Sequence, residues 1–141
     1  MRTMSPEETR AFLLAETRTA HVATVRADGR PHVVPVWFTL DGDDIIFTTW
    51  HETIKARTIA RDPRISLSVD DATPPFAYVA IDGRATLSND LAALRHWATR
   101  IAERYMGAAQ AEAFGQRNAI AGELLVRVTP THVIAHSHMT E

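Results

Sequence analysis

Residues 47–64 read FTTWHETIKARTIARDPR. The opening FTTW is typical of a β-strand, whereas residues 52–62 have the spacing of a helix that Pro63 ends. A strand therefore runs directly into the N-terminus of a helix. That end of a helix presents free backbone N–H groups and the positive end of the helix dipole, so it favours an anion. The segment predicts a phosphate-binding site where the strand meets the helix.

The side chains of this segment strengthen the preference for an anion. Lys55 places a positive charge in the first helical turn, and three threonines supply hydroxyl donors: Thr48, Thr49 and Thr53. Arg57 and Arg61 lie four residues apart, so they share a helix face that could form a second anionic contact. Taken alone, these cations also fit an amphipathic surface helix with solvated charges, which is the commoner case. The residues by themselves leave both interpretations open.

Three strands are expected before this helix, at residues 19–26, 31–40 and 45–50. They are rich in β-branched residues, and two Asp-Gly turns, at residues 27–30 and 41–44, join them. Because tight turns join consecutive antiparallel strands, this half of the chain is predicted to form a three-stranded meander.

The rest of the chain supplies the elements of a barrel. Ser5 and Glu8 form the pattern of a capping box for an N-terminal helix, and Gly83 predicts a bend or bulge within a strand. The expected helices cover residues 6–16 and 91–105, with short helical pieces in 108–122, and the expected strands cover 64–69, 76–87, 123–128 and 132–138. Six to seven antiparallel strands with few helices predict a closed β-barrel, because closure removes exposed sheet edges. Residues 1–141 are expected to form one domain.

Composition narrows the class of protein. The chain has 141 residues, a formal net charge of −2 and no cysteine. The near-neutral charge gives no electrostatic case for binding nucleic acid or an anionic membrane. The lack of cysteine excludes disulfides, thiolate metal sites and a cysteine nucleophile. No apolar run resembles a signal peptide or a membrane span, so a cytoplasmic location is expected.

Four segments, residues 23–38, 47–67, 78–87 and 126–133, carry a family resemblance. The chain resembles the pyridoxamine-phosphate-oxidase-like split-barrel superfamily, especially its short flavin- and deazaflavin-dependent members. The strand, Lys-x-Arg, helix and Asp-Pro-Arg run is the most specific of these matches. The resemblance implies a mainly β fold with flanking helices, the FMN-binding split barrel. It also implies a homodimer with two cofactor sites at the interface.

The resemblance also implies which residues hold the cofactor. The backbone after the first hairpin would lie beside the flavin ring, which corresponds here to Val34, Pro35, Val36 and Trp37. The strand end and the helix start would hold the phosphate, which corresponds to Thr48, Thr49, Thr53, Lys55 and Arg57. Arg57 and Arg61 would also suit the acidic tail of the deazaflavin F420. F420 is therefore the expected cofactor, with FMN as the alternative.

The expected function is that of an oxidoreductase that transfers a hydride from reduced F420 to a small electron-poor acceptor. The alternatives are an FMN-binding relative of pyridoxamine-phosphate oxidase, or a non-catalytic binder of flavin, haem or another tetrapyrrole. The sequence indicates no catalytic residue, although His51 and Tyr78 could lie near the site. His132, His136 and His138 have the even spacing that would place them on one face of a strand. Surface histidines are the commoner case, and no metal site is predicted.

Overall fold

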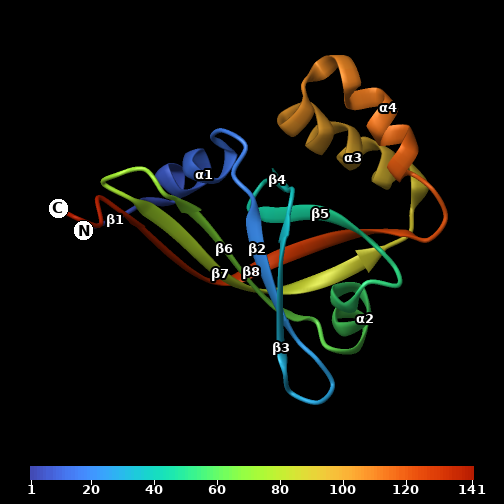
Figure 1. Cartoon of the computed structure of the whole chain (residues 1–141), viewed down its shortest axis with the longest axis horizontal. Coiled ribbons are helices and arrows are strands. Elements are labelled where there is room, and N and C mark those ends of the chain that lie inside the picture. Colours follow the sequence, from blue (N-terminus) through green and yellow to red (C-terminus); the bar gives the residue numbers. More distant parts are fainter.

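The computed structural model describes residues 1–141 as an eight-stranded antiparallel sheet flanked by four helices (Figure 1). The strands are β1 (Arg2–Thr3), β2 (Ala20–Val25), β3 (Pro31–Val36), β4 (Thr39–Asp41), β5 (Asp44–Trp50), β6 (Arg64–Asp71), β7 (Ala77–Ser88) and β8 (Glu123–Ser137). The helices are α1 (Pro6–Leu14), α2 (Ile54–Arg61), α3 (Leu91–Met106) and α4 (Ala108–Asn118). None of the helices combines the length and the apolar character needed to cross a membrane.

The strand order shows how the sheet closes on itself. The order is β3-β2-β6-β7-β8-β5-β4, and β1 pairs with the far end of β8. Only two residues, Trp37 and Phe38, separate β3 from β4 in sequence, although these strands occupy opposite ends of the order. The sheet must therefore curl enough to bring the end of β3 next to the start of β4, although these two strands do not pair, and this makes it a split barrel.

This order contradicts the predicted three-stranded meander. Residues 31–40 are two strands, β3 and β4, and each pairs with a different neighbour. The break has a tertiary cause. The Phe38 side chain is fully buried in the core, and its backbone groups bond to α3 instead of a strand. Tyr105 Oη accepts the Phe38 N–H, and Arg104 donates to the Phe38 carbonyl.

The last strand is longer than predicted. Residues 123–128 and 132–138, expected as two strands, belong to the single strand β8, which ends at Ser137. The bulge predicted at Gly83 is confirmed by a register shift between Asp82 and Gly83, and Pro130 lies opposite Gly83. A bulge tolerates a residue that has no N–H, so Pro130 does not break the strand.

The helices follow their local signals, with two differences. The predicted capping box is present, since Glu8 N–H donates to Ser5 Oγ and Ser5 N–H donates to Glu8 Oε1, at 3.1 and 3.0 Å. Helix α1 nevertheless ends at Leu14, two residues before the predicted end. Residues 108–118 form one helix, α4, rather than short pieces, and its Gly115 lies against Thr99 of α3.

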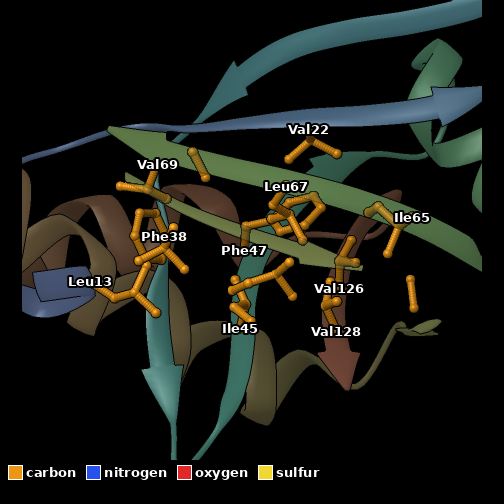
Figure 2. Close-up of a cluster of buried hydrophobic side chains, with 14 of the residues drawn as sticks. Leu13, Val22, Phe38, Ile45, Phe47, Ile65, Leu67, Val69, Val126 and Val128 are labelled. Atoms are coloured by element: carbon orange, nitrogen blue, oxygen red, sulfur yellow. The ribbon is translucent and has the colours of Figure 1, made fainter. Parts of the chain in front are cut away.

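The main core fills the barrel. Seventeen buried side chains form this cluster, and Figure 2 shows Leu13 and Phe38 at one end and Ile65 at the other. A smaller cluster of Ile46, Leu94 and Leu125 fixes α3 to the outer face of β5 and β8. Helices α3 and α4 lie together on one side of the barrel (Figure 1). A pocket lies between this pair of helices and the strands.

Candidate functional site

A pocket of about 270 Å³ lies between the barrel, α2 and the α3–α4 pair. Half of its lining comes from residues that the sequence predicted as cofactor ligands: Pro35, Val36, Trp37, Thr48 and Lys55. The other half comes from the two C-terminal helices: Ala98, Ile101, Ala102, Phe114 and Asn118. The pocket therefore has one cation, one hydroxyl, one amide and otherwise apolar or aromatic walls.

A larger cavity, of about 610 Å³, lies between α1, the β4–β5 turn and β8. Its only basic residue, Arg10, is already paired with Asp43. Asp44, which also lines this cavity, is paired with Arg127. No free positive charge remains for a phosphate there, so the smaller pocket at Lys55 is the better candidate for an anionic cofactor.

Lys55 is the only lysine in the chain and is half-buried at the start of α2. Burial lowers the pKa of its ammonium group, and the Glu123 carboxylate on β8 opposes this by raising it. Burial in turn raises the pKa of Glu123, and Lys55 lowers it. For each group the effect of burial is the larger one. An incoming phosphate would stabilise the ammonium that burial now disfavours.

The predicted threonines divide into two roles. Thr48 faces the pocket, whereas Thr49 is buried. Thr49 Oγ1 lies 2.8 Å from Thr53 Oγ1, and Thr53 Oγ1 accepts the Ala56 N–H at 3.2 Å. Thr53 is therefore the N-cap of α2, and Thr49 supports that cap. Neither lines the pocket; together they fix the helix start that presents Lys55.

The remaining predicted residues lie outside the pocket lining. Val34 is a half-buried residue of β3 that pairs with Val22 of β2. Arg57 is exposed. The Arg61 guanidinium donates to the Val25 carbonyl at the end of β2, so this side chain ties the last turn of α2 to the first hairpin.

Trp37 forms a stacked pair with Tyr105 at the pocket. The ring centroids are 4.8 Å apart and the planes differ by 2°. Tyr105 Oη donates to the Arg18 carbonyl at 2.6 Å and accepts the Phe38 N–H at 3.3 Å. Burial raises the pKa of Tyr105, so its hydroxyl remains a donor at neutral pH.

Arg104 is the residue of this region that the sequence did not indicate. Its guanidinium donates to the carbonyls of Phe38 at 2.8 Å, Leu13 at 2.8 Å and Glu16 at 3.1 Å. It therefore joins α3 to the end of α1 and to the β3–β4 break. A basic residue in the last turn of a helix is common, because it complements the helix dipole. Nothing in that pattern distinguishes Arg104 from a solvated arginine.

The predicted histidines and Tyr78 lie elsewhere. Tyr78 Oη lies 3.1 Å from His136 Nδ1, on strands β7 and β8, and neither residue lines the pocket. His51 is exposed beside Trp50. His138 lies beyond the end of β8 with φ of 52°, so it does not continue the alternation of His132 and His136. No group of three or more His, Asp or Glu side chains could hold a metal ion.

Comparison with known proteins identifies relatives with this architecture. Residues 5–137 match the family described as pyridoxamine 5'-phosphate oxidase. An F420H(2)-dependent biliverdin reductase from Mycobacterium tuberculosis is 33% identical over 92 residues, which are 65% of this chain and 66% of the relative, slightly less than two thirds.

Two solved structures have the same fold. The conserved hypothetical protein Rv2991 from Mycobacterium tuberculosis is 26% identical with a TM-score of 0.84, covering 96% of this chain and 86% of that one. A structure named F420 reductase is 29% identical with a TM-score of 0.70, covering 86% of this chain and 93% of that one.

Proposed function

The chain belongs to the pyridoxamine 5'-phosphate oxidase family, and on that premise we propose that it is an F420-dependent reductase that transfers a hydride to a small electron-poor acceptor. The observation that carries the proposal is the pocket at Lys55. It combines a single cation at a helix N-terminus with an aromatic and apolar wall. The relatives named for F420 favour the deazaflavin over FMN.

The residues present fit a flavin-type cofactor. Lys55 and the free N–H groups at the start of α2 would hold the phosphate. Pro35, Val36 and Trp37 would lie along the ring. Arg57, exposed on the same helix, is available to an acidic tail. A reduced deazaflavin supplies a hydride, and the protein contributes position, exclusion of water and charge.

We also propose that the working form is a homodimer. Strand β3 pairs only with β2, so its outer edge is free, and its Val33 is 63% exposed. Exposed strand edges and large apolar side chains are features that a partner chain covers. The pocket has a volume of about 270 Å³, slightly less than the roughly 300 Å³ of the smallest ligand sites, and its lining includes Pro35 and Val36 of β3, where a second copy would enclose it further.

Titration of the purified protein with F420, and separately with FMN, tests the proposal through tryptophan emission. We expect F420 to bind more tightly. Lys55→Ala should weaken binding by at least tenfold, because it removes a charge-assisted contact to phosphate. Arg64→Ala is the control, since Arg64 is exposed and paired with Asp62 at 2.7 Å. Equal affinities of the two variants would contradict the placement of the phosphate.

Two further measurements separate the alternatives. Mixing the reduced cofactor with candidate acceptors, such as enones, quinones or tetrapyrroles, and following its reoxidation distinguishes a reductase from a non-catalytic binder. Light scattering gives the oligomeric state. A monomer that binds the cofactor tightly would refute the dimer, and tighter binding of FMN would assign the protein to the flavin-dependent branch.

A further inference from the structure

The exposure of Trp37 is the observation that needs an explanation. The chain buries its other residue at the β3–β4 break, Phe38, completely, yet Trp37 remains 45% exposed. One face of its indole lies on Tyr105, at 4.8 Å and nearly parallel, and the indole also lines the Lys55 pocket. A packing role for this side chain would place it in the core cluster, to which it does not belong.

Tyr105 is held in place by hydrogen bonds and by a cation–π contact, in addition to its packing. Its hydroxyl donates to the Arg18 carbonyl and accepts the N–H of Phe38, the residue that follows Trp37. The Arg104 guanidinium carbon lies 4.9 Å from the centroid of the Tyr105 ring. The hydroxyl that orients Tyr105 therefore also holds the backbone next to Trp37. The same two hydrogen bonds therefore fix the Tyr105 ring and the backbone next to Trp37, so the indole is held in its orientation before a ligand binds.

We infer that Tyr105 is a positioning residue that holds the Trp37 indole as a stacking wall of the Lys55 pocket, so that a planar conjugated ring lies on its free face. The inference rests on the proposed function, because the ring is that of the cofactor or acceptor. A flat, preoriented indole favours extended conjugated rings over compact or aliphatic ligands, since stacking gains with shared planar area. The two residues then bind different parts of the ligand: Trp37 stacks on the ring and Lys55 binds the phosphate.

This division can be tested with pairs of ligands that share a ring and differ in the phosphate. Riboflavin and FMN are one such pair. F420 and its chromophore without the phosphate and acidic tail are the other. Dissociation constants are measured by ligand absorbance and fluorescence for the wild type and for Trp37→Leu, Tyr105→Leu, Tyr105→Phe and Lys55→Ala. Circular dichroism confirms that each variant is folded, and tryptophan emission reports the stack independently of activity.

We expect Trp37→Leu to weaken both members of a pair by about five- to tenfold. It should also remove a large part of the emission quenching that the ring causes, while Trp50 and Trp97 still emit. Tyr105→Leu should weaken both members because the indole loses its support. Tyr105→Phe keeps the stacked ring but loses the hydroxyl that orients it, so it should weaken both members by less than Tyr105→Leu does. Lys55→Ala should weaken only the phosphate-bearing member.

The two claims fail in different ways. Unchanged affinity of Trp37→Leu for a ring compound without phosphate would overturn the stacking wall, even if Lys55→Ala abolished FMN or F420 binding. The reverse result, a loss with Trp37→Leu and none with Lys55→Ala, would overturn the phosphate site and support the wall. If Tyr105→Leu does not fold, Tyr105→Phe decides the positioning role, because wild-type affinity of that variant for both members of a pair would overturn it. Failure of every ring compound to bind the wild type would also overturn the inference.

Discussion

Replacing Arg104 by methionine should destabilise the fold at the β3–β4 break, where Arg104 binds the Phe38 carbonyl. Methionine keeps a long unbranched side chain and a similar helix propensity, so the main change is the loss of the guanidinium. That group makes four hydrogen bonds to backbone carbonyls: three of 2.8, 2.8 and 3.1 Å, and a longer one of 3.4 Å to Ala15. A hydrogen bond to a charged group contributes about 1.5–3 kcal/mol net, so the three shorter bonds at the lower limit amount to roughly 4.5 kcal/mol.

Water will recover part of this loss, because Arg104 is only half-buried and Glu16, which supplies one of the freed carbonyls, is exposed, whereas Phe38 and Leu13 are buried. We therefore expect the free energy of unfolding to fall by about 2–4 kcal/mol, which is a large share of the stability of an ordinary domain. The measurement is urea unfolding followed by circular dichroism and by tryptophan emission. The emission should also change in the folded state, because Arg104 holds the carbonyl of Phe38 next to Trp37.

Arg100→Met is the matched control, one turn earlier on the same helix. Arg100 is exposed and makes no hydrogen bond to a backbone carbonyl, although its guanidinium lies 5.8 Å from the Trp97 ring. Its replacement should change stability by no more than about 0.5 kcal/mol. If Arg104→Met proved as mild as Arg100→Met, the view that α3 fastens the β3–β4 break would be refuted.

Three further predictions concern close contacts and charge. Gly115→Ala would place a Cβ 1.8 Å from Thr99 Oγ1, so it should cost about 1–3 kcal/mol in urea unfolding, and Thr99→Ala in the same chain should restore most of that loss; additive effects would argue against the contact. Gly122→Ala should destabilise by about 1–3 kcal/mol, because φ is +99° and the new Cβ would lie 2.5 Å from Trp50 Cη2; a neutral outcome in the same assay would contradict that geometry. Affinity for FMN should fall as the pH rises through the lowered pKa of Lys55, since only the protonated amine attracts phosphate; Lys55→Arg should bind independently of pH over that range, and an identical profile for both would exclude Lys55.

Local signals in the sequence predicted local structure well. The Ser5 capping box, the helix that follows Trp50 and the bulge at Gly83 depend on neighbouring residues or on backbone geometry, and all three are present. The split of residues 31–40 into two strands was not predictable in the same way. It depends on Arg104 and Tyr105, which lie more than sixty residues away and satisfy the backbone of Phe38. The pattern of apolar and polar residues within 31–40 contains no signal of that contact.

The candidate site shows the same limit. Lys55 and Thr48 were predicted from the strand–helix junction, and Pro35, Val36 and Trp37 from the family resemblance; all five line one pocket. The wall formed by α3 and α4 was missed, because Ala98 and Ala102 are ordinary helical residues whose small size matters only opposite β3 and β5. Thr49 carries a hydroxyl like Thr48, but the alternation of β5 turns it toward the interior.

The position of β8 in the sheet has a consequence for the order of folding. This strand pairs with β5, β7 and β1, so residues 45–50 meet residues 123–128 across most of the chain. A nascent chain on the ribosome can form the first hairpin and α2 early, but it cannot close the barrel until residue 128 has emerged. Contacts between residues so distant in sequence require the chain to lose much conformational entropy before the strands pair and pack. Folding is therefore expected in the slow range of about milliseconds to seconds. Until β8 is in place, the edges of β5 and β7 remain open, and that interval is when a growing chain is most exposed to aggregation.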